Sequence, residues 1–284
     1  MSNIEKIFPL APMQESLLFA HFSMPESRAY YQQVVVQFRG ELNVPCLIQT
    51  LEHLIAKYEV FRTIYVTEKV KQAMQVVVKM RKVTLNTLDI SDKEVEEQDI
   101  LLEKHTKEEI NQAFDLAKDL LLRFLLIKTG ENQHIFIWTY HHILMDGWGR
   151  QKIWQDFMET YFLLAQKMTL PPLKKQSYQP YVDWLKLQNK ENQRLFWKNY
   201  LTTWQEQTSL PQIHFSAEKG YDFAQSSVEL SEELVQKLKK IAQDAQTTLN
   251  VLCNVAWAYL LHHYTQKKHA LFRHCKICFS SKFK

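Results

Sequence analysis

The chain contains 284 residues, 46% of them hydrophobic, which is enough to bury one large core or two smaller ones. Its 35 Lys and Arg residues and 31 Asp and Glu residues give a formal net charge of +4, with the two signs interspersed. Because no basic block would follow a phosphate backbone, we expect no nucleic-acid partner. The N-terminus lacks the apolar segment of a secretory signal, and the most apolar run, residues 251–261, is too short to span a bilayer. A soluble, cytoplasmic protein is therefore expected.

The four cysteines do not form the pattern of a disulfide framework. Cys46 and Cys253 each lie within a helical pattern, and only Cys275 and Cys278 are close in sequence. A single CxxC pair without a second pair of ligands does not complete a zinc site. We therefore expect no structural disulfide and no bound metal.

The first part of the chain alternates helical and strand patterns. Residues 9–19 are predicted as a short helix, residues 31–38 as a strand that stops at Gly40, and Asn43 as the cap of a helix that reaches Tyr58. Residues 61–66 and 73–78 are predicted to form an antiparallel pair joined by a charged turn. Helices and strands are thus mixed from the beginning.

The middle of the chain continues in the same way. Residues 83–90 are predicted as a further strand, and Ser91 is expected to start a polar, peripheral helix that ends near residue 112. Residues 120–127 and 134–140 then form a predicted hairpin around the turn at 129–132.

The last part of the chain is predicted to be helical. A helix ends near Lys167, and Pro171 and Pro172 forbid its continuation, which marks the clearest linker. Helices are predicted over 178–187 and 192–204, after a cap at Ser231, and over 248–264, the last being the more buried. Hairpins together with strand-helix units favour a mixed α/β sandwich over a doubly wound parallel sheet.

Residues 140–149, YHHILMDGWG, occupy the turn between the predicted strand 134–140 and the helix that follows it. Two of the chain's five glycines, Gly147 and Gly149, fall in this turn, where the backbone must bend or approach another group closely. Adjacent side chains in an extended segment point to opposite faces, so His141 and His142 should face different environments, one interior and one open. A histidine that titrates near neutrality can accept a proton from an amine or alcohol. The alternative is that the two histidines simply end a buried strand.

The turn resembles the HHxxxDG motif of the acyltransferase superfamily that contains chloramphenicol acetyltransferase and the condensation domains of nonribosomal peptide synthetases. Three further stretches are similar to condensation-domain motifs and occur in the same order. They are FPLAPMQESLLF at residues 8–19, EVFRT at 59–63 with Tyr58 in place of the family's histidine, and YVDW at 181–184. The resemblance covers residues 1 to about 204 well and weakens beyond that point.

The resemblance implies a chloramphenicol acetyltransferase-like mixed sheet sandwich flanked by helices, an α/β (α+β) fold. It also implies an activity: forming an amide bond between an acyl or peptidyl thioester on one carrier protein and the amine of an aminoacyl group on another. Both substrates would arrive on phosphopantetheine arms of donor and acceptor carrier proteins in adjacent synthetase modules, with no cofactor bound directly.

The resemblance also assigns residues. His142 is the implied active-site residue, either as a general base for the amine or as an orienting and charge-stabilising group. His141, Asp146, Gly147 and Arg62 are expected to support the site, with Arg62 as the ionic partner of Asp146. Met13, Gln14 and Trp148 are candidates for lining the substrate tunnel.

Domain organisation follows from the same comparison. We expect an acyltransferase-like lobe at 1–170, a linker with helices at 171–222, the start of a second lobe at 223–272, and an aberrant tail at 273–284. Such a chain would be a truncated copy, and apolar surface around Val251, Val255, Trp257 and Leu260 would favour self-association or a partner chain. The alternatives are a stand-alone acyltransferase that uses acyl-CoA and a non-catalytic remnant that docks carrier proteins.

Overall fold

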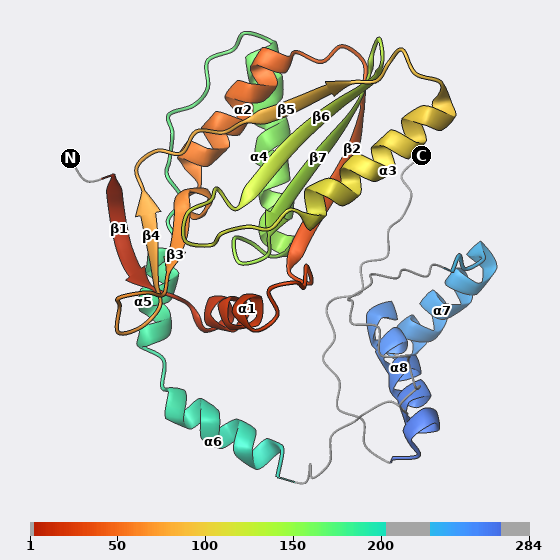
Figure 1. The fold of residues 1–284 in the computed structure, drawn as a ribbon. Helices are drawn as coiled ribbons and strands as arrows, with labels where there is room; N and C mark the ends of the chain where they lie inside the picture. Colours follow the sequence, from red (N-terminus) through yellow and green to blue (C-terminus); the bar gives the residue numbers. More distant parts are fainter. Residues whose placement is uncertain (1–2, 203–227, 268–284) are drawn as a thin grey trace. The chain divides into compact units, whose positions relative to one another are not determined.

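The computed structural model describes residues 3–202 and 228–267 of the chain (Figure 1). These residues belong to two compact units, Met1–Gln188 and Asn189–Lys284. The tail at 273–284, with Cys275 and Cys278, lies outside the described residues. The first unit carries both sheets and the motif turn, and each unit is described below by itself.

A four-stranded sheet forms the centre of the first unit, in the order β2-β7-β6-β5. Its strands are β2 (Tyr31–Arg39), β7 (Gln133–His141), β6 (Leu122–Gly130) and β5 (Leu85–Asp89). Strand β7 pairs antiparallel with both β2 and β6, which confirms the predicted β6–β7 hairpin, whereas β5 pairs parallel with β6. The sheet is therefore mixed, and the strand that leads into the motif is one of its two interior strands.

A separate three-stranded sheet has the order β1-β4-β3, with β1 (Ile4–Pro9), β4 (Met74–Val78) and β3 (Thr63–Val66). The predicted antiparallel pairing of β3 with β4 is confirmed. Strand β1 was not predicted, because Glu5 and Lys6 interrupt its apolar residues. It forms because it pairs antiparallel with β4, a distant part of the sequence.

Five α-helices and one short 3₁₀ helix accompany the sheets in the first unit. The helices are α1 (Pro12–Ser23), α2 (Val44–Lys57), α3 (Val95–Asn111), α4 (Gly147–Ala165) and α5 (Gln179–Lys186), and the 3₁₀ helix is Glu59–Arg62. The Asn43 side chain accepts a hydrogen bond from Cys46 N, so the predicted cap of α2 is confirmed. The polar helix α3 contains no fully buried residue, as its charge pattern predicts, although it begins at Val95 and not at Ser91.

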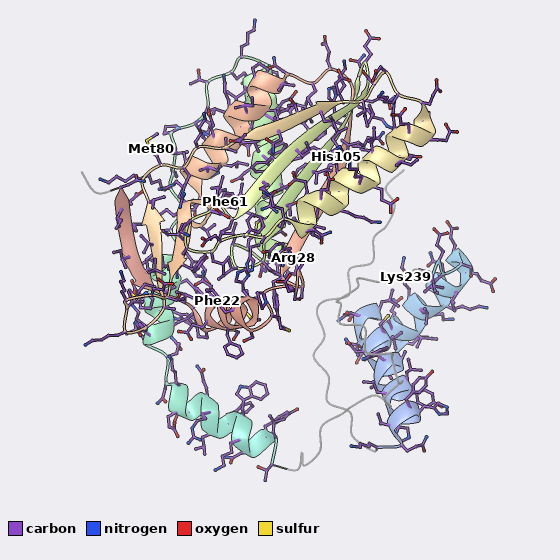
Figure 2. The ribbon with its side chains drawn as sticks, viewed as in Figure 1. Phe22, Arg28, Phe61, Met80, His105 and Lys239 are labelled. Atoms are coloured by element: carbon purple, nitrogen blue, oxygen red, sulfur yellow. The ribbon has the colours of Figure 1, made fainter. Side chains whose placement is uncertain are left out.

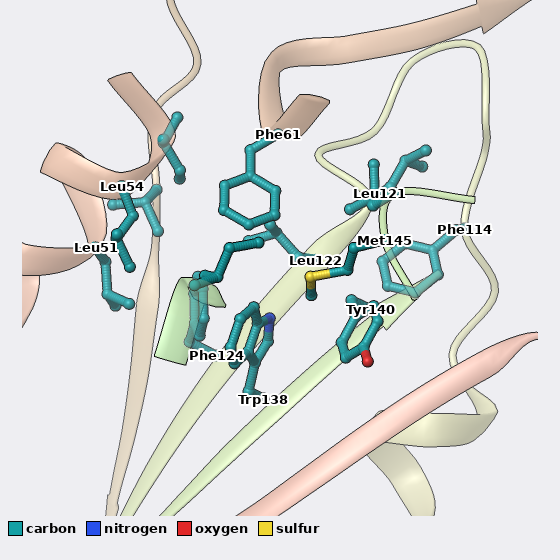
Figure 3. Close-up of a cluster of buried hydrophobic side chains, with 14 of the residues drawn as sticks. Leu51, Leu54, Phe61, Phe114, Leu121, Leu122, Phe124, Trp138, Tyr140 and Met145 are labelled. Atoms are coloured by element: carbon teal, nitrogen blue, oxygen red, sulfur yellow. The ribbon is translucent and has the colours of Figure 1, made fainter. Parts of the chain in front are cut away.

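The two faces of the four-stranded sheet bury different sets of side chains, as the alternation of strand residues requires. Phe124 and Trp138 face α2 and α4 and join the larger core with Leu51 and Leu54, shown in Figure 3. Leu125, Ile127 and Ile137 face the opposite side, where Leu101 and Leu102 of α3 pack against them. Figure 2 shows Phe61 inside the unit and Phe22 at its surface, in agreement with their exposed fractions of 3% and 56%.

The first unit extends through Gln188, beyond the boundary expected at 170. Gln176 N donates to Lys57 O at 2.7 Å, which ties the proline-rich segment back to the end of α2. Val182 of α5 is buried against Phe8 and Val77 of the three-stranded sheet. These apolar contacts, which no local pattern reveals, attach the first helix after the prolines to the first unit.

The second unit contains α6 (Lys190–Tyr200), α7 (Glu232–Asp244) and α8 (Leu249–Thr265) among its described residues. Ser231 caps α7 as predicted, since its hydroxyl accepts from Leu234 N at 3.3 Å. Helix α8 was expected to be more buried than α7, but each helix has one buried residue, Leu261 in α8 and Ala242 in α7. Because α8 has an apolar sequence and is largely exposed, large hydrophobic side chains of this helix lie in solvent. Within the described ranges, no helix is both long enough and apolar enough to cross a membrane.

Candidate active site

The motif turn begins where β7 ends and is held by backbone hydrogen bonds on both sides. His141 N donates to Leu121 O at 3.0 Å, and His142 N donates to Tyr30 O at 2.7 Å. Leu144 N then donates to His141 O at 3.1 Å, which closes the turn on itself. The backbone that carries the two histidines is therefore anchored to the segments that flank β7.

His141 is completely buried and serves the turn from inside. Its Nδ1 accepts a hydrogen bond from Ile143 N at 3.1 Å. Because a backbone N–H can only donate, Nδ1 carries the lone pair and the ring proton is on Nε2. Burial, together with the nearby His21 and His142, lowers the pKa of His141 to about 3, so its ring is neutral at physiological pH. The ring therefore contributes one hydrogen bond to the backbone of the turn.

His142 is half-buried, and its ring is held in the opposite tautomer. Its Nδ1 lies 2.8 Å from Met145 O, and a carbonyl oxygen can only accept, so the proton is on Nδ1. Nε2 therefore keeps the lone pair and is the nitrogen that can take a proton from a substrate. The neutral neighbour His141 places no positive charge beside this ring. The turn thus holds the Nδ1 atoms of two adjacent histidines in opposite hydrogen-bonding roles, as an acceptor in His141 and as a donor in His142.

Asp146 accepts a backbone hydrogen bond at the start of α4. It is exposed, and its Oδ1 accepts from Gly149 N at 2.8 Å, which makes it the cap of α4. A Cβ at Gly149 would make tight contacts, 3.3 Å from Met145 Cβ and 3.4 Å from Asp146 Oδ1, so these neighbours would have to shift by a few tenths of an ångström. Gly147 was expected to meet a similar constraint, but a Cβ there would have no described atom within 4 Å. The tight contacts therefore lie at position 149 and not at position 147.

The predicted ion pair between Arg62 and Asp146 is wrong. Arg62 is 2% exposed, so it is also not a surface arginine. Its Nη1 donates to Glu5 Oε2 at 2.7 Å and to Val78 O, and its Nε donates to Ile55 O at 3.1 Å. Arg62 thus joins α2, β1 and β4, and Asp146 is not among its partners in the described residues.

The three residues proposed for the substrate tunnel are placed differently from one another. Met13 and Trp148 are 55% and 65% exposed, whereas Gln14 is 5% exposed. Gln14 Oε1 accepts from Ala11 N and from the Gln75 side chain, and its Nε2 donates to Tyr65 Oη at 3.2 Å. Since its amide is engaged within the protein, Gln14 has a structural position and not a lining position.

Sequence reasoning missed the residues that connect this amide to the motif. The Tyr65 hydroxyl donates to Ile143 O at 3.3 Å, so Gln14 and Tyr65 together tie α1 and β3 to the motif turn. The sequence contained a signal for a structural role of Gln75, because it is a polar residue within an otherwise apolar strand. The sequence contained no such signal for Glu5, since its partner Arg62 is distant in sequence. Within residues 3–202 and 228–267, no group of three or more His, Cys, Asp or Glu side chains could hold a metal ion.

Comparison with protein families identifies the family of the chain that carries this turn. The sequence model of the family described as Condensation domain matches residues 4–274. The chain belongs to the condensation domain family. The gramicidin S synthase 2 of Aneurinibacillus migulanus is 32% identical over 271 residues, which are 95% of this chain and 6% of that protein. Surfactin synthase subunit 3 of Bacillus subtilis (strain 168) is 30% identical over 266 residues, 93% of this chain and 21% of that protein. The condensation domain described here therefore spans a small part of the length of these relatives.

Solved condensation domains have the same fold. A variant of the starter condensation domain of the rhizomide synthetase in complex with C8-CoA matches with a TM-score of 0.77 and 19% identity, covering 93% of this chain and 60% of that one. The first condensation domain of the CDA synthetase matches with a TM-score of 0.73 and 18% identity, covering 93% and 63%. The predicted chloramphenicol acetyltransferase-like mixed fold is thereby confirmed.

Proposed function

We propose that this condensation domain forms an amide bond between an acyl or peptidyl thioester on a donor carrier protein and the amine of an aminoacyl group on an acceptor carrier protein. Condensation domains are acyltransferases that form amide bonds, and the chain belongs to that family. The observation that supports the proposal most directly is the tautomer of His142, whose Nδ1–H is engaged with Met145 O. Nε2 of this ring is therefore left as an acceptor.

The reaction needs one proton moved and no cofactor bound by this domain. The amine nitrogen attacks the thioester carbonyl carbon, the C–N bond forms, and the C–S bond breaks. The proton that the amine loses ends on the sulfur of the released phosphopantetheine thiol. His142 Nε2 would take this proton from the amine and return it to the thiolate, which leaves the histidine unchanged after each turnover.

His142 could also act by orienting the amine and stabilising developing charge, without accepting its proton. General base catalysis contributes about 10²- to 10⁴-fold, and preorganised electrostatic stabilisation about 10²- to 10³-fold for one donor, so magnitude does not separate the two roles. Glutamine separates them, because its amide can hydrogen-bond an amine but cannot accept a proton at neutral pH. A base predicts that His142→Gln is as inactive as His142→Ala. An orienting role predicts that His142→Gln keeps much of the activity.

Substrates and partners follow from the same proposal. The pantetheine arms of the two carrier domains would bring the thioester and the amine to His142, and the exposed Met13 and Trp148 are the side chains we propose to contact them. Gln14 is not included, because its amide is internally bonded. We expect the adjacent modules of a synthetase to supply both carriers, in the cytoplasm.

The experiment uses the full polypeptide that the gene encodes, with donor and acceptor carrier proteins loaded separately. Mass spectrometry of the acceptor arm detects the amide product. We expect product from the unmodified protein and at least 100-fold less from His142→Ala. Full activity of His142→Ala would refute the assignment. An acyl-CoA donor replaces the acyl-carrier protein in a parallel reaction, and turnover with acyl-CoA alone would refute the carrier-bound donor.

A further inference from the structure

The buried ring of His141 has a polar atom that its own turn does not satisfy. Nδ1 accepts from Ile143 N, which places a proton on Nε2, and Nε2 is buried without a hydrogen-bond partner among the described residues. A buried N–H without an acceptor destabilises the folded state, so its surroundings must offer some compensation. The groups around this ring therefore decide whether the turn stays in place.

Two aromatic rings lie against His141. The His21 ring centroid is 5.3 Å from that of His141 at an interplanar angle of 74°, and the Tyr31 centroid is 5.4 Å away at 67°. Both arrangements are edge-to-face, the geometry in which a ring edge with its positive hydrogens meets the negative face of another ring. An N–H directed at such a face makes a weak hydrogen bond. His21 comes from the last turn of α1, and Tyr31 begins β2.

We propose that His21 is a positioning residue for the condensation reaction: its neutral ring, with Tyr31, holds the His141 ring and thereby fixes the turn that carries His142. The inference rests on the proposed role of His142 and adds a residue that never touches substrate. The connection runs through two contacts, since His141 holds Ile143 N and the same turn places His142 Nδ1 against Met145 O. Loss of the His21 ring would let the His141 ring, and with it the turn, change position.

The contact also depends on the protonation of His21. Burial is the main cause that lowers the pKa of His21 below its ordinary 6.5, and the charge of Arg28 lowers it further, while Asp115 opposes both. A protonated imidazole loses its electron-rich face and sets a positive charge against the buried neutral His141. Since the unfolded chain binds this proton more readily than the folded one, acidification below pH 6.5 disfavours the folded arrangement. His21 thus holds His141 best when it is neutral.

Two substitutions separate the ring from the charge. His21→Phe keeps an aromatic face that cannot be protonated, and His21→Leu removes the face. The matched control is His53→Phe on α2, because His53 is also half-buried and burial also lowers its pKa, while the charged groups that act on it, Lys57 and Asp156, lie outside the motif turn. Each protein is assayed as the full polypeptide for kcat and KM between pH 5 and pH 8, and its histidine rings are followed by NMR with ¹⁵N-labelled histidine.

We expect His21→Leu to lower kcat by about 10- to 100-fold with little change in KM, as misplacement of a catalytic group does. His21→Phe should restore most of kcat at pH 7 and should lose less activity than the unmodified protein as the pH falls toward 5. In NMR, the Nε2 proton of His141 should exchange with water faster in His21→Leu than in His21→Phe. His53→Phe should match the unmodified protein in all of these measurements.

Equal kcat values for the unmodified protein and His21→Leu would overturn the inference, and so would failure of His21→Phe to restore what His21→Leu loses. An Nε2–H exchange rate that is identical in all three proteins would overturn it whatever the activities are. The proposed function fails separately, when His142→Ala remains fully active, because the NMR measurement does not depend on turnover.

Discussion

Replacing Arg62 with methionine tests how α2, β1 and β4 are held together in the first unit. The methionine keeps much of the volume and removes the charge and every hydrogen bond. Buried carbonyls at Ile55 and Val78 would lose their donor, and Glu5, 20% exposed, would keep only the exposed Lys175 as an ionic partner. Breaking a buried ion pair typically costs about 3–5 kcal/mol. One guanidinium nitrogen of Arg62, Nη2, is already unsatisfied, so we expect the lower end, about 3 kcal/mol.

A double-mutant cycle identifies the partner of Arg62. Combining Arg62→Met with Glu5→Gln should give a coupling energy of about 1–2 kcal/mol, because both variants remove the same interaction. Combining Arg62→Met with Asp146→Asn should be additive within about 0.5 kcal/mol, since Asp146 caps α4 and does not contact Arg62. Asp146→Asn is thus the matched control for the loss of a carboxylate.

The assay must report on the first unit alone, because a chain with two units need not unfold in one step. Hydrogen exchange of peptides from β4 and β7, measured by mass spectrometry against urea concentration, gives that local free energy of unfolding. Additivity with Glu5→Gln, or strong coupling with Asp146→Asn, would refute the assignment of the ion pair.

Three further predictions concern the two motif histidines, the stability of the first unit at acid pH, and self-association through the second unit. His141→Ala should lower the stability of the first unit by about 2–4 kcal/mol in the same exchange assay, whereas His142→Ala should change it by less than about 1 kcal/mol; the reverse order would contradict their assigned roles. Hydrogen bonds from Lys175 and then Arg62 lower the pKa of Glu5 to about 2, so its contribution is complete above pH 4.5 and is lost as the pH falls toward 2. The stability difference between the unmodified protein and Glu5→Gln should shrink over that range, and a constant difference would exclude this linkage. Val255 on α8 is 60% exposed within an apolar helix, so Val255→Asp should reduce concentration-dependent self-association in sedimentation velocity, while Lys239→Asp on α7 should not; a chain that stays monomeric at every concentration would contradict this.

Features that depend on neighbouring residues could be predicted from the sequence alone. The caps at Asn43 and Ser231, the β6–β7 hairpin and the turn with two histidines of unequal exposure follow from patterns a few residues long. Helical and strand periodicity is a local property of the chain, so these elements could be predicted without knowing what they pack against. Four motifs in order were also enough to indicate the family.

Contacts between segments that are distant in sequence depend on the tertiary structure. Arg62 meets Glu5 and not Asp146 because β1 pairs with β4, which brings together side chains 57 residues apart. The fold brings His21, in the last turn of α1, to His141 at the end of β7, and α5 joins the first unit because Val182 packs against the three-stranded sheet. Each of these side chains has several chemically acceptable partners along the chain. The pairing and packing of distant segments selects one of them.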